Sequence, residues 1–465
     1  MATRNYLYYE LTNSICSQCW RKIEAKVIIQ QGKVYLLKNC LEHGREQVLI
    51  STDADYYRQC REFNKPGDLP KRFNTQINQG CPYDCGLCPD HEQHSCVTLI
   101  EITERCNLTC PTCYANAGPT QGRHRTLAEI ATMLDIVVAN EGQPDVVQIS
   151  GGEPTIHPDF FAILDLAKQK PIRHLMVNTN GLRIAQDKEF AKKLADYLPG
   201  FELYLQFDTF EPTTWQKLRG LDLSEIKAQA LAHLNELNLS TTLVVTLQAG
   251  LNTHEIGKII DFAIQQPCIR GVTFQPLQFA GRYDSDAVTQ GKITLAEIRQ
   301  AILKQTSLFS PADLIPVPCH PDAIAMAYAL KLADQVVPLT RFLDPQVLLS
   351  TPQNTINFEH IPQLKQQVYN LFSTSKSTAA AAEELKSIMC CLPKITAPEL
   401  KYEHLFRVII MQFYDAYNFD VRGVKKSCVH IVHPDGRIIP FDTMNLFYRN
   451  NVVDKLKNVA DVDKY

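Results

Sequence analysis

The sequence lacks any hydrophobic run that approaches the roughly 20 residues needed to span a membrane. Its first residues also lack the apolar core of a signal peptide, so we expect a cytoplasmic protein with no membrane span. The formal net charge is only −3, which gives no reason to expect a nucleic-acid or anionic-membrane partner. The sequence also shows no P-loop and no Ser/His/Asp triad, so neither competes with other motifs as the source of the chemistry.

Cysteine, in contrast, is abundant. The chain of 465 residues is long enough for roughly two to four domains and contains sixteen cysteines. In the cytoplasm, cysteines in this number indicate metal ligands more often than disulfides. Eleven of them precede residue 114, and the others are Cys268, Cys319, Cys390, Cys391 and Cys428. We therefore expect metal chemistry near the start of the chain and a smaller set of ligands near its end.

A central motif with the spacing C-x3-C-x2-C carries Cys106, Cys110 and Cys113, and Tyr114 follows it. Three thiolates on one short loop suit a [4Fe–4S] cluster and leave its fourth iron free to bind another molecule. A zinc knuckle or a disulfide pair is the alternative interpretation, but zinc knuckles usually repeat C-x2-C twice. The spacing therefore favours a cluster.

The first 60 residues are typical of a small metal ribbon. Cys16 and Cys19 form a first knuckle, a β-hairpin is predicted over 27–36, and Cys40 with His43 forms a second pair. Such ligands suit tetrahedral Zn²⁺, or a rubredoxin-like mononuclear iron if a cysteine such as Cys60 replaces His43. A module this small has little core, so the metal would supply much of its folding energy.

A second C-x3-C-x2-C motif follows within 61–96. It consists of Cys81, Cys85 and Cys88. We predict that it holds an auxiliary [4Fe–4S] cluster, with Cys96 as the candidate fourth ligand. The alternative is a second zinc site that uses His91 or His94, because clusters of cysteine and histidine suit zinc equally well.

From residue 97 the pattern changes to alternating strands and helices. Strands are predicted at 97–102, 145–150, 174–179, 201–207, 241–248 and 271–277. A capping box at Thr126 opens the first helix, and further helices are predicted near 158–169, 187–197, 224–237 and 254–265. This α/β alternation implies a parallel sheet with right-handed crossovers, with too few units for a closed eight-fold barrel.

Unusual residues follow the ends of these strands, where parallel sheets carry their chemistry. The second strand leads into Gly151, Gly152 and Glu153, the third into Asn180 and the fourth into Asp208. A Gly-Gly pair allows close backbone approach to a ligand, and Glu153 could accept a hydrogen bond from an ammonium group. Each of these polar residues could also be an ordinary turn or helix cap.

The remainder of the chain is predicted to be mostly helical. A capping box at Thr294 and amphipathic runs at 322–335, 360–372 and 378–391 indicate helices, and another is predicted over 400–417. A β-hairpin with an Asp-Gly turn then joins 428–433 to 437–441. The expected units are 1–60, 61–96, 97–280, 281–395 and 396–465.

Taken together, these motifs resemble the radical SAM superfamily, and within it the class D methyltransferase-like group. The resemblance covers nearly the full chain. It rests on the N-terminal C-x2-C and C-x2-H pairs, the run from Cys81 to His91, the central triplet, the Gly-Gly-Glu sequence and the C-terminal segment from Val429 to Phe441. It implies a partial (β/α)6 barrel in which the central triplet holds a catalytic [4Fe–4S] cluster. The residues that would line S-adenosylmethionine are Tyr114, Gly151, Gly152, Glu153, Asn180 and Asp208. The candidate ligands of a further auxiliary cluster are Cys319, Cys390 or Cys391, and Cys428.

The resemblance also implies the reaction class. A flavodoxin or ferredoxin-type donor would reduce the cluster, S-adenosylmethionine would be cleaved, and the resulting 5′-deoxyadenosyl radical would attack an unactivated carbon. The expected outcome is methylation of a pterin-like small molecule, with the methyl from a second S-adenosylmethionine. The alternatives are carbon–carbon coupling of lipid tails and a non-catalytic Fe–S redox protein.

This chain departs from the group at two positions. Members tend to carry a cysteine where this sequence has Ser427 and another where it has Asp442. The departure leaves the ligands of the C-terminal auxiliary cluster open.

Overall fold

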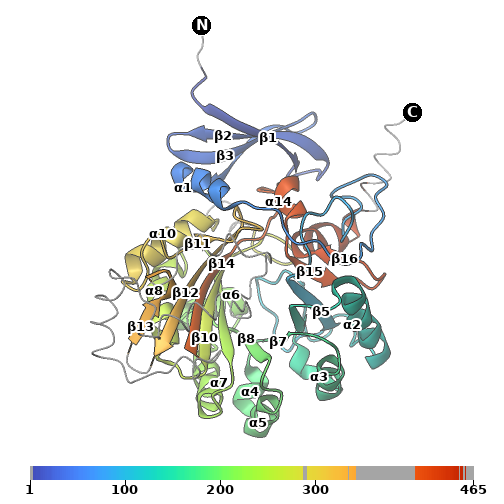
Figure 1. The fold of residues 1–465 in the computed structure, drawn as a ribbon, viewed down its shortest axis with the longest axis vertical. Helices are drawn as coiled ribbons and strands as arrows, with labels where there is room; N and C mark the ends of the chain where they lie inside the picture. The colour runs from blue at the N-terminus through green and yellow to red at the C-terminus, as the bar shows by residue number, and fades with distance from the viewer. Residues whose placement is uncertain are drawn as a thin grey trace, which may run out of the picture.

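Four antiparallel strands with alternating burial form a separate sheet at the N-terminus (Figure 1). They are β1 (Leu7–Ile15), β2 (Lys22–Gln30), β3 (Lys33–Cys40) and β4 (Gly44–Ser51). The predicted hairpin is confirmed as β2–β3, and Gln31 and Gly32 form its turn with positive φ angles of 51° and 72°. Helix α1 (Ala54–Gln59) packs Ala54 and Tyr57 against this sheet.

The computed structural model describes residues 4–285, 291–332, 335–341, 404–449, 451–453 and 456. Its larger sheet has twelve strands, and the six strands predicted from 97 onward form its centre. These are β5 (Val97–Thr103), β6 (Val146–Gly151), β7 (His174–Thr179), β8 (Phe201–Gln206), β9 (Thr241–Leu247) and β10 (Ile269–Pro276). Neighbours in this row are all parallel, so their carboxyl ends lie at one edge.

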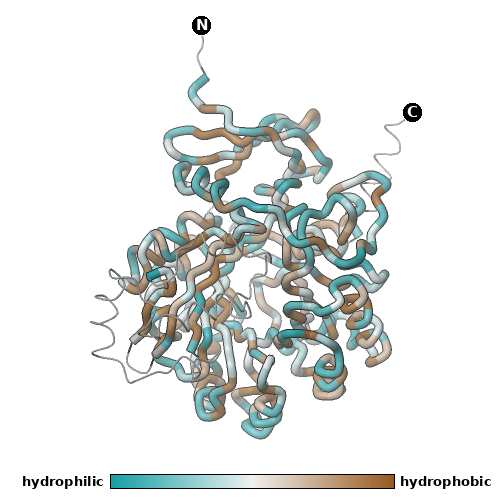
Figure 2. Tube along the Cα trace, viewed as in Figure 1, coloured by the Kyte–Doolittle hydropathy of each residue, from teal (hydrophilic) through white to brown (hydrophobic). Residues whose placement is uncertain are grey.

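Helices cover the outer face of this row (Figure 1). They are α2 (Leu127–Glu141), α3 (Phe160–Lys168), α4 (Leu182–Gln186), α5 (Lys188–Ala195), α7 (Ser224–Glu236), α8 (Ile256–Gln265) and α10 (Leu295–Gln305). Helix α6 (Pro212–Arg219) lies further inside and packs Trp215 against the cysteine loop. The capping boxes at Thr126 and Thr294 are both present. Figure 2 shows hydrophobic residues along the strands and hydrophilic ones toward the outside of the helices, as expected for amphipathic helices on a sheet.

The C-terminal prediction of helices at 322–335 and 400–417 is wrong. Those segments form β12 (Ile324–Leu332) and β14 (Leu405–Met411), with β11 (Ile315–Pro316) and β13 (Gln335–Pro338) beside β12. β14 extends the parallel row next to β10, and β12 pairs with it antiparallel. Both strands are buried on both faces, and periodicity cannot separate such a strand from a buried helix. The predicted helices at 360–372 and 378–391 lie outside the described residues.

The C-terminal hairpin is confirmed. It consists of β15 (Val429–Val432) and β16 (Ile438–Pro440), and β15 pairs in parallel with β5 at the other edge of the row. Short helices complete the described chain: α14 (Val421–Lys425), α15 (Phe441–Thr443), a π-helix at Met444–Tyr448, and 3₁₀ turns at Cys60–Phe63, Pro154–Ile156, Thr253–Glu255 and Leu339–Arg341. Within these ranges, the helices are all too short or too polar to cross a bilayer.

Candidate functional site

The central cysteine loop leaves the carboxyl end of β5. Cys106 and Cys110 are buried and Cys113 is half-buried. The Leu108 amide donates to the Cys106 Sγ at 3.4 Å, and the Cys106 amide donates to the Gly118 carbonyl at 3.1 Å. The loop is therefore held in shape by its own backbone, and burial, with a smaller contribution from the neighbouring thiols, raises the pKa of Cys106 and Cys110.

Arg282 fixes this loop from outside, which the sequence did not reveal. Its Nε donates to the Cys110 carbonyl at 2.6 Å, and its backbone exchanges two hydrogen bonds with Cys113. Gly281 precedes it with a φ of +67°, and a Cβ there would lie 2.3 Å from the Tyr114 carbonyl oxygen. A glycine is thus required for the segment after β10 to reach the cysteine loop.

The Gly-Gly pair has a structural role in this chain. A Cβ on Gly151 would lie 2.2 Å from the Thr103 carbonyl oxygen, and one on Gly152 would lie 2.2 Å from the Arg105 carbonyl oxygen. The pair thus allows the end of β6 to pass against the start of the cysteine loop. We predicted that the Gly-Gly pair allows a ligand to approach closely. Among the contacts described, the pair allows two backbone segments to approach each other.

Glu153 is fully enclosed at the end of β6. Its Oε1 accepts hydrogen bonds from the Thr155 amide, the Thr155 hydroxyl and the Thr179 hydroxyl, and its Oε2 accepts one from the Asn180 amide at 2.8 Å. Burial raises the pKa of Glu153, although these hydrogen bonds oppose the shift. A carboxylate oxygen has two acceptor positions, so Oε2 retains one for a further donor.

Asn180 connects β7 to the cysteine loop. Its Nδ2 donates to the Asn107 Oδ1 at 2.7 Å, and its own Oδ1 accepts from the Leu182 amide. Because Asn107 lies between two of the cysteines, this amide pair fixes the loop relative to the end of β7. Asn180 therefore lies at the predicted site, with its side chain engaged by the loop.

Asp208 does not face an open space. It is fully buried, and Arg219 binds it through two hydrogen bonds of 2.7 and 2.9 Å. Arg219 also lies close to the Cys110 thiol, whose pKa is raised by burial while the Arg219 charge opposes that shift. Asp208 thus positions Arg219, and Arg219 is the group that reaches the cysteine loop. Only the tertiary fold brings Arg219 there, so spacing could not reveal it.

A cavity inside the barrel begins beside the cysteine loop. Tyr114, the residue after Cys113, lines it together with inward side chains from β5 to β10, β14 and β15. The space is about 740 Å³ including its open mouth. Arg407 also lines the cavity and donates to the buried Glu202 at 2.9 Å, and Glu202 lies 3.2 Å from His174 Nε2, so the cavity borders a buried ionic network.

The second cysteine triplet is brought together by the fold. Burial raises the pKa of both Cys85 and Cys88, and the neighbouring Cys81 adds to the shift of Cys85. Thr443 donates to the Cys85 Sγ at 3.0 Å from the segment after β16. His91 lies elsewhere: its Nε2 is 2.9 Å from the Ser427 carbonyl, and burial lowers its pKa to about 4.

We predicted that Cys96 would lie with the second triplet, but it lies with Cys319 and Cys428. All three are buried, and their thiols are near enough to shift one another's pKa. His94 places its Nε2 3.5 Å from the Cys96 Sγ. These cysteines come from segments that are far apart in sequence, so no local motif could group them. Cys390 and Cys391 lie outside the described residues.

The two positions where this chain departs from its group are neighbours. Ser427 donates from its hydroxyl to the Asp442 carboxylate at 3.2 Å, and both side chains are buried. Burial raises the pKa of Asp442 to about 6. Ser427 directly precedes Cys428 in the sequence, and Asp442 contacts Ser427. The departure therefore falls next to the group of Cys96, Cys319 and Cys428.

The ribbon site is compact. Its four ligands, Cys16, Cys19, Cys40 and His43, place one atom each within 4.8 Å of all the others. The His43 Nδ1 lies 3.6 Å from the Cys16 Sγ and 3.5 Å from the Cys40 Sγ. Such a set fits one tetrahedral ion. Cys60 takes no part, because it is buried beside Tyr56, and burial raises its pKa to about 12.

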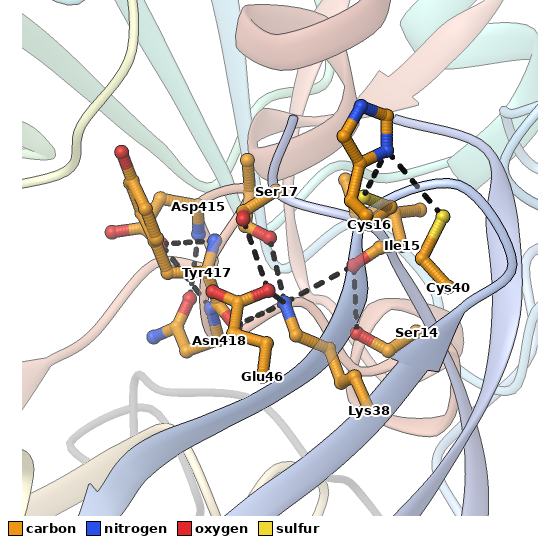
Figure 3. A network of polar contacts seen from close by, with 12 residues as sticks. Ser14, Ile15, Cys16, Ser17, Lys38, Cys40, Glu46, Asp415, Tyr417 and Asn418 are labelled. Atoms are coloured by element: carbon orange, nitrogen blue, oxygen red, sulfur yellow. Dashed lines mark hydrogen bonds and ion pairs between the residues drawn. The ribbon is translucent and has the colours of Figure 1, made fainter. Parts of the chain in front are cut away.

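A buried lysine ties this ribbon to the barrel (Figure 3). The Lys38 Nζ donates to the carbonyls of Ile15, Ala416 and Tyr417 and forms an ion pair of 2.9 Å with Glu46. Ile15 immediately precedes the ligand Cys16. The metal site and the segment that follows β14 are therefore connected through one ammonium group.

Comparisons with known proteins agree with this arrangement. A model of the radical SAM superfamily matches residues 100–263, and a model of the HMPTM N-terminal zinc ribbon domain matches residues 8–52. The 7,8-dihydro-6-hydroxymethylpterin dimethyltransferase of Methanocaldococcus jannaschii is 30% identical over 96% of this chain and 95% of its own. The Fe-coproporphyrin III synthase of Methanosarcina barkeri is 30% identical over 49% of this chain and 56% of its own.

Among solved structures, Streptococcus suis SuiB bound to S-adenosylmethionine is similar at a TM-score of 0.38 and 19% sequence identity. The match covers 45% of this chain and 47% of that one.

Proposed function

Because this chain belongs to the radical SAM superfamily, we propose that it methylates a pterin-like small molecule inside the barrel cavity. The observation that carries the proposal is the continuity of the two sites. Tyr114 belongs to the cysteine loop and also lines the cavity. A radical formed at the loop would therefore meet a substrate that lies in the barrel.

The donor set supports a cluster at the central loop. Cys106, Cys110 and Cys113 are three thiols on one loop with no fourth ligand from the loop itself. In the described part of the chain, the groups whose ligand atoms all lie within 4.8 Å are the ribbon site and Glu211 with His254 and Glu255. The central thiols are thus spaced more widely than a single-ion site. This spacing suits a multi-iron group.

When bound, the cluster and S-adenosylmethionine supply a 5′-deoxyadenosyl radical. We assign Glu153 to the cofactor's amino group, because its Oε2 retains an acceptor position and its other contacts hold it rigid. Arg219 is assigned to stabilise negative charge at Cys110, and Asp208 to position Arg219. Asn180 and the Gly-Gly pair keep the loop in place.

The electron and atom balance defines what the enzyme consumes. For each methyl group, two electrons come from a flavodoxin or ferredoxin-type donor. In this balance, one electron and one bound S-adenosylmethionine would supply the radical, and a hydrogen atom from a substrate carbon would leave methionine and 5′-deoxyadenosine as products. The second electron and the methyl group of another S-adenosylmethionine would complete the new carbon–carbon bond, with S-adenosylhomocysteine as the product.

Two auxiliary sites belong to the same proposal. We assign one auxiliary [4Fe–4S] cluster to Cys81, Cys85 and Cys88. A second is assigned to the group that consists of Cys96, Cys319 and Cys428. The contacts among these thiols support the regrouping of Cys96. Zn²⁺ is assigned to the ribbon, because its ligand set is Cys₃His with His43, and Cys60, which the iron alternative required, lies outside it.

The apolar part of the cavity lining favours a second candidate function, the coupling of lipid tails. One experiment separates the two. The reduced enzyme is incubated anaerobically with methyl-deuterated S-adenosylmethionine and 7,8-dihydro-6-hydroxymethylpterin or, separately, with lipid extract. A deuterated methylpterin together with 5′-deoxyadenosine and S-adenosylhomocysteine is expected. A lipid product lighter by hydrogen, without S-adenosylhomocysteine, would overturn methylation in favour of coupling.

A further inference from the structure

Two amide side chains inside the barrel have no partner in the described part of the chain. Gln148 on β6 is only 5% exposed and Asn178 on β7 is half-buried, and both line the cavity. We propose that Gln148 and Asn178 bind the polar edge of a flat nitrogen heterocycle and so select the substrate. The inference rests on the proposed function, because it names the groups that would read a pterin-like ring.

Strand register places the two amides on the same wall. β6 and β7 are adjacent parallel strands, and Gln148 lies opposite Met176. Asn178 is two residues beyond Met176 and therefore points to the same face, one step closer to the carboxyl end. It is also two residues before Asn180, which binds the cysteine loop through Asn107. The wall thus faces the cavity directly below the predicted cofactor site.

The amide on the opposite wall is already paired. Gln275 on β10 donates from its Nε2 to the Tyr204 hydroxyl at 3.3 Å, across the intervening strand β9. The Thr273 hydroxyl on the same strand is buried without a partner among the described residues. Much of the other lining is apolar, including Leu99, Met176 and Val244. The cavity therefore offers apolar surfaces for the faces of a ring and free amides on one side only.

This asymmetry discriminates between the two substrate classes. A hydrocarbon chain in the cavity would cover both amides without offering them a hydrogen bond, and a buried polar group without a partner is destabilising. A primary amide presents a donor and an acceptor in one plane, so it pairs with a ring edge that carries a neighbouring acceptor and donor. The carbonyl, ring nitrogen and amino group of an aminopyrimidinone form such an edge.

The test uses the holoenzyme and 7,8-dihydro-6-hydroxymethylpterin as the probe, with equilibrium binding measured anaerobically by dialysis. Gln148→Met and Asn178→Leu keep the side-chain size and remove the amide. Each is expected to weaken binding about tenfold, which corresponds to ~1.4 kcal/mol. Gln169→Met is the matched control, because Gln169 is exposed at the end of α3 and lies outside the cavity.

A second readout separates recognition from general damage. The analogue that carries a carbonyl in place of the ring amino group should bind the wild type more weakly than the pterin does. Gln148→Met and Asn178→Leu should reduce that preference, whereas loss of structure would weaken both ligands alike. Iron content and thermal midpoint identify a variant that has not folded, and the other variant then carries the test.

The outcomes are distinct for the inference and for the function on which it rests. If the wild type binds the pterin and both folded variants bind it equally well with the same preference, this inference is wrong and the proposed function stands. If the wild type does not bind the pterin, the proposed function fails and this inference fails with it.

Discussion

The ribbon site and the group of Cys96, Cys319 and Cys428 are both built from buried cysteines, but their assembly differs. The ribbon ligands lie at the ends of neighbouring strands of one small sheet, and their positions follow from β2, β3 and the turns beside them. The other three cysteines come from the segment before β5, the loop before β12 and the residue before β15. They meet only when the twelve-stranded sheet is complete.

The ribbon site and the central cysteine loop are expected to contribute to different properties of the protein. A ribbon with a small core depends on its ion for stability, so its metal is expected to act as a structural element. The central loop is held by hydrogen bonds from Arg282 and Asn180, so its cysteines are expected to serve chemistry. Stability and chemistry should therefore respond to different cysteines.

The largest effect is expected at the central loop. Cys110→Ala should reduce 5′-deoxyadenosine formation to background, because two thiolates do not hold the cluster in the form that binds the cofactor. The folded scaffold should survive, since Arg282 contacts Cys110 through its backbone carbonyl, which the substitution leaves in place. The measurement is anaerobic product analysis after reduction with dithionite.

Cys268→Ala is the matched control for this loss. Cys268 is as completely buried, but it lies in the apolar core of the barrel. Wild-type yield from Cys110→Ala, or an equal loss from Cys268→Ala, would contradict the assignment of the central loop.

Zinc removal should affect stability rather than the cluster. Selective chelation, or Cys16→Ser, should unfold the ribbon, because structural zinc contributes on the order of 10 kcal/mol to such modules. Hydrogen exchange should rise across Leu7–Ser51 while β5 to β10 keep their protection. Fast exchange in the barrel strands to the same extent would mean that the two regions fold as one unit.

The nonlocal group is expected to bind iron. Cys428→Ser should remove about four irons per chain and leave the zinc content unchanged, since Cys428 contacts Cys96 and Cys319 but no ribbon ligand. Metal analysis after anaerobic reconstitution measures both. Cys268→Ser should keep the full iron content, and unchanged iron in Cys428→Ser would show that this group holds no cluster.

How far the sequence predicted each part depends on the same distinction. The six central strands, the capping boxes and the ribbon ligands depend on residues that are close in sequence, and the structure confirms the strands and capping boxes and brings the ribbon ligands together. Arg219 and Arg282 reach the cysteine loop only through the fold, and no motif marks them. Spacing predicted the triplets but misplaced Cys96.

The errors at the C-terminus have a related cause. Ile324–Leu332 is rich in alanine, which favours helices in isolation, yet it lies between β11 and β14 and is buried on both faces. Leu405–Met411 forms parallel pairs with β10, a partner more than a hundred residues earlier. Burial and strand pairing in the completed sheet determine both conformations. A local sequence pattern contains information about neither burial nor pairing.

Substitution of Lys38 should weaken the connection between the ribbon and the barrel. Lys38→Met should lower the free energy of unfolding by about 1–3 kcal/mol, because three buried carbonyls lose their donor. Exchange should rise at Ala416 and Tyr417 while zinc stays bound. Lys26→Met is the control, since Lys26 is exposed on the neighbouring strand. Unchanged exchange at these two residues would mean that the ribbon and the barrel are joined by other contacts.

The smallest expected effect is on the pH dependence of stability, where the buried lysine of the barrel, Lys227, differs from that of the ribbon, Lys38. Lys38 forms an ion pair with Glu46, whereas Lys227 donates to the Asn180 carbonyl and lies over the Trp215 ring. Burial lowers the pKa of Lys227 to about 7. Between that pKa and the value near 10.5 in the unfolded chain, the unfolded state binds more protons, so stability rises with pH. From pH 7 to pH 8 the gain should be about 1 kcal/mol, and Lys227→Met should abolish it. Thermal midpoints of both proteins, measured with their clusters intact at the two pH values, test the difference; parallel shifts would mean that Lys227 stays charged.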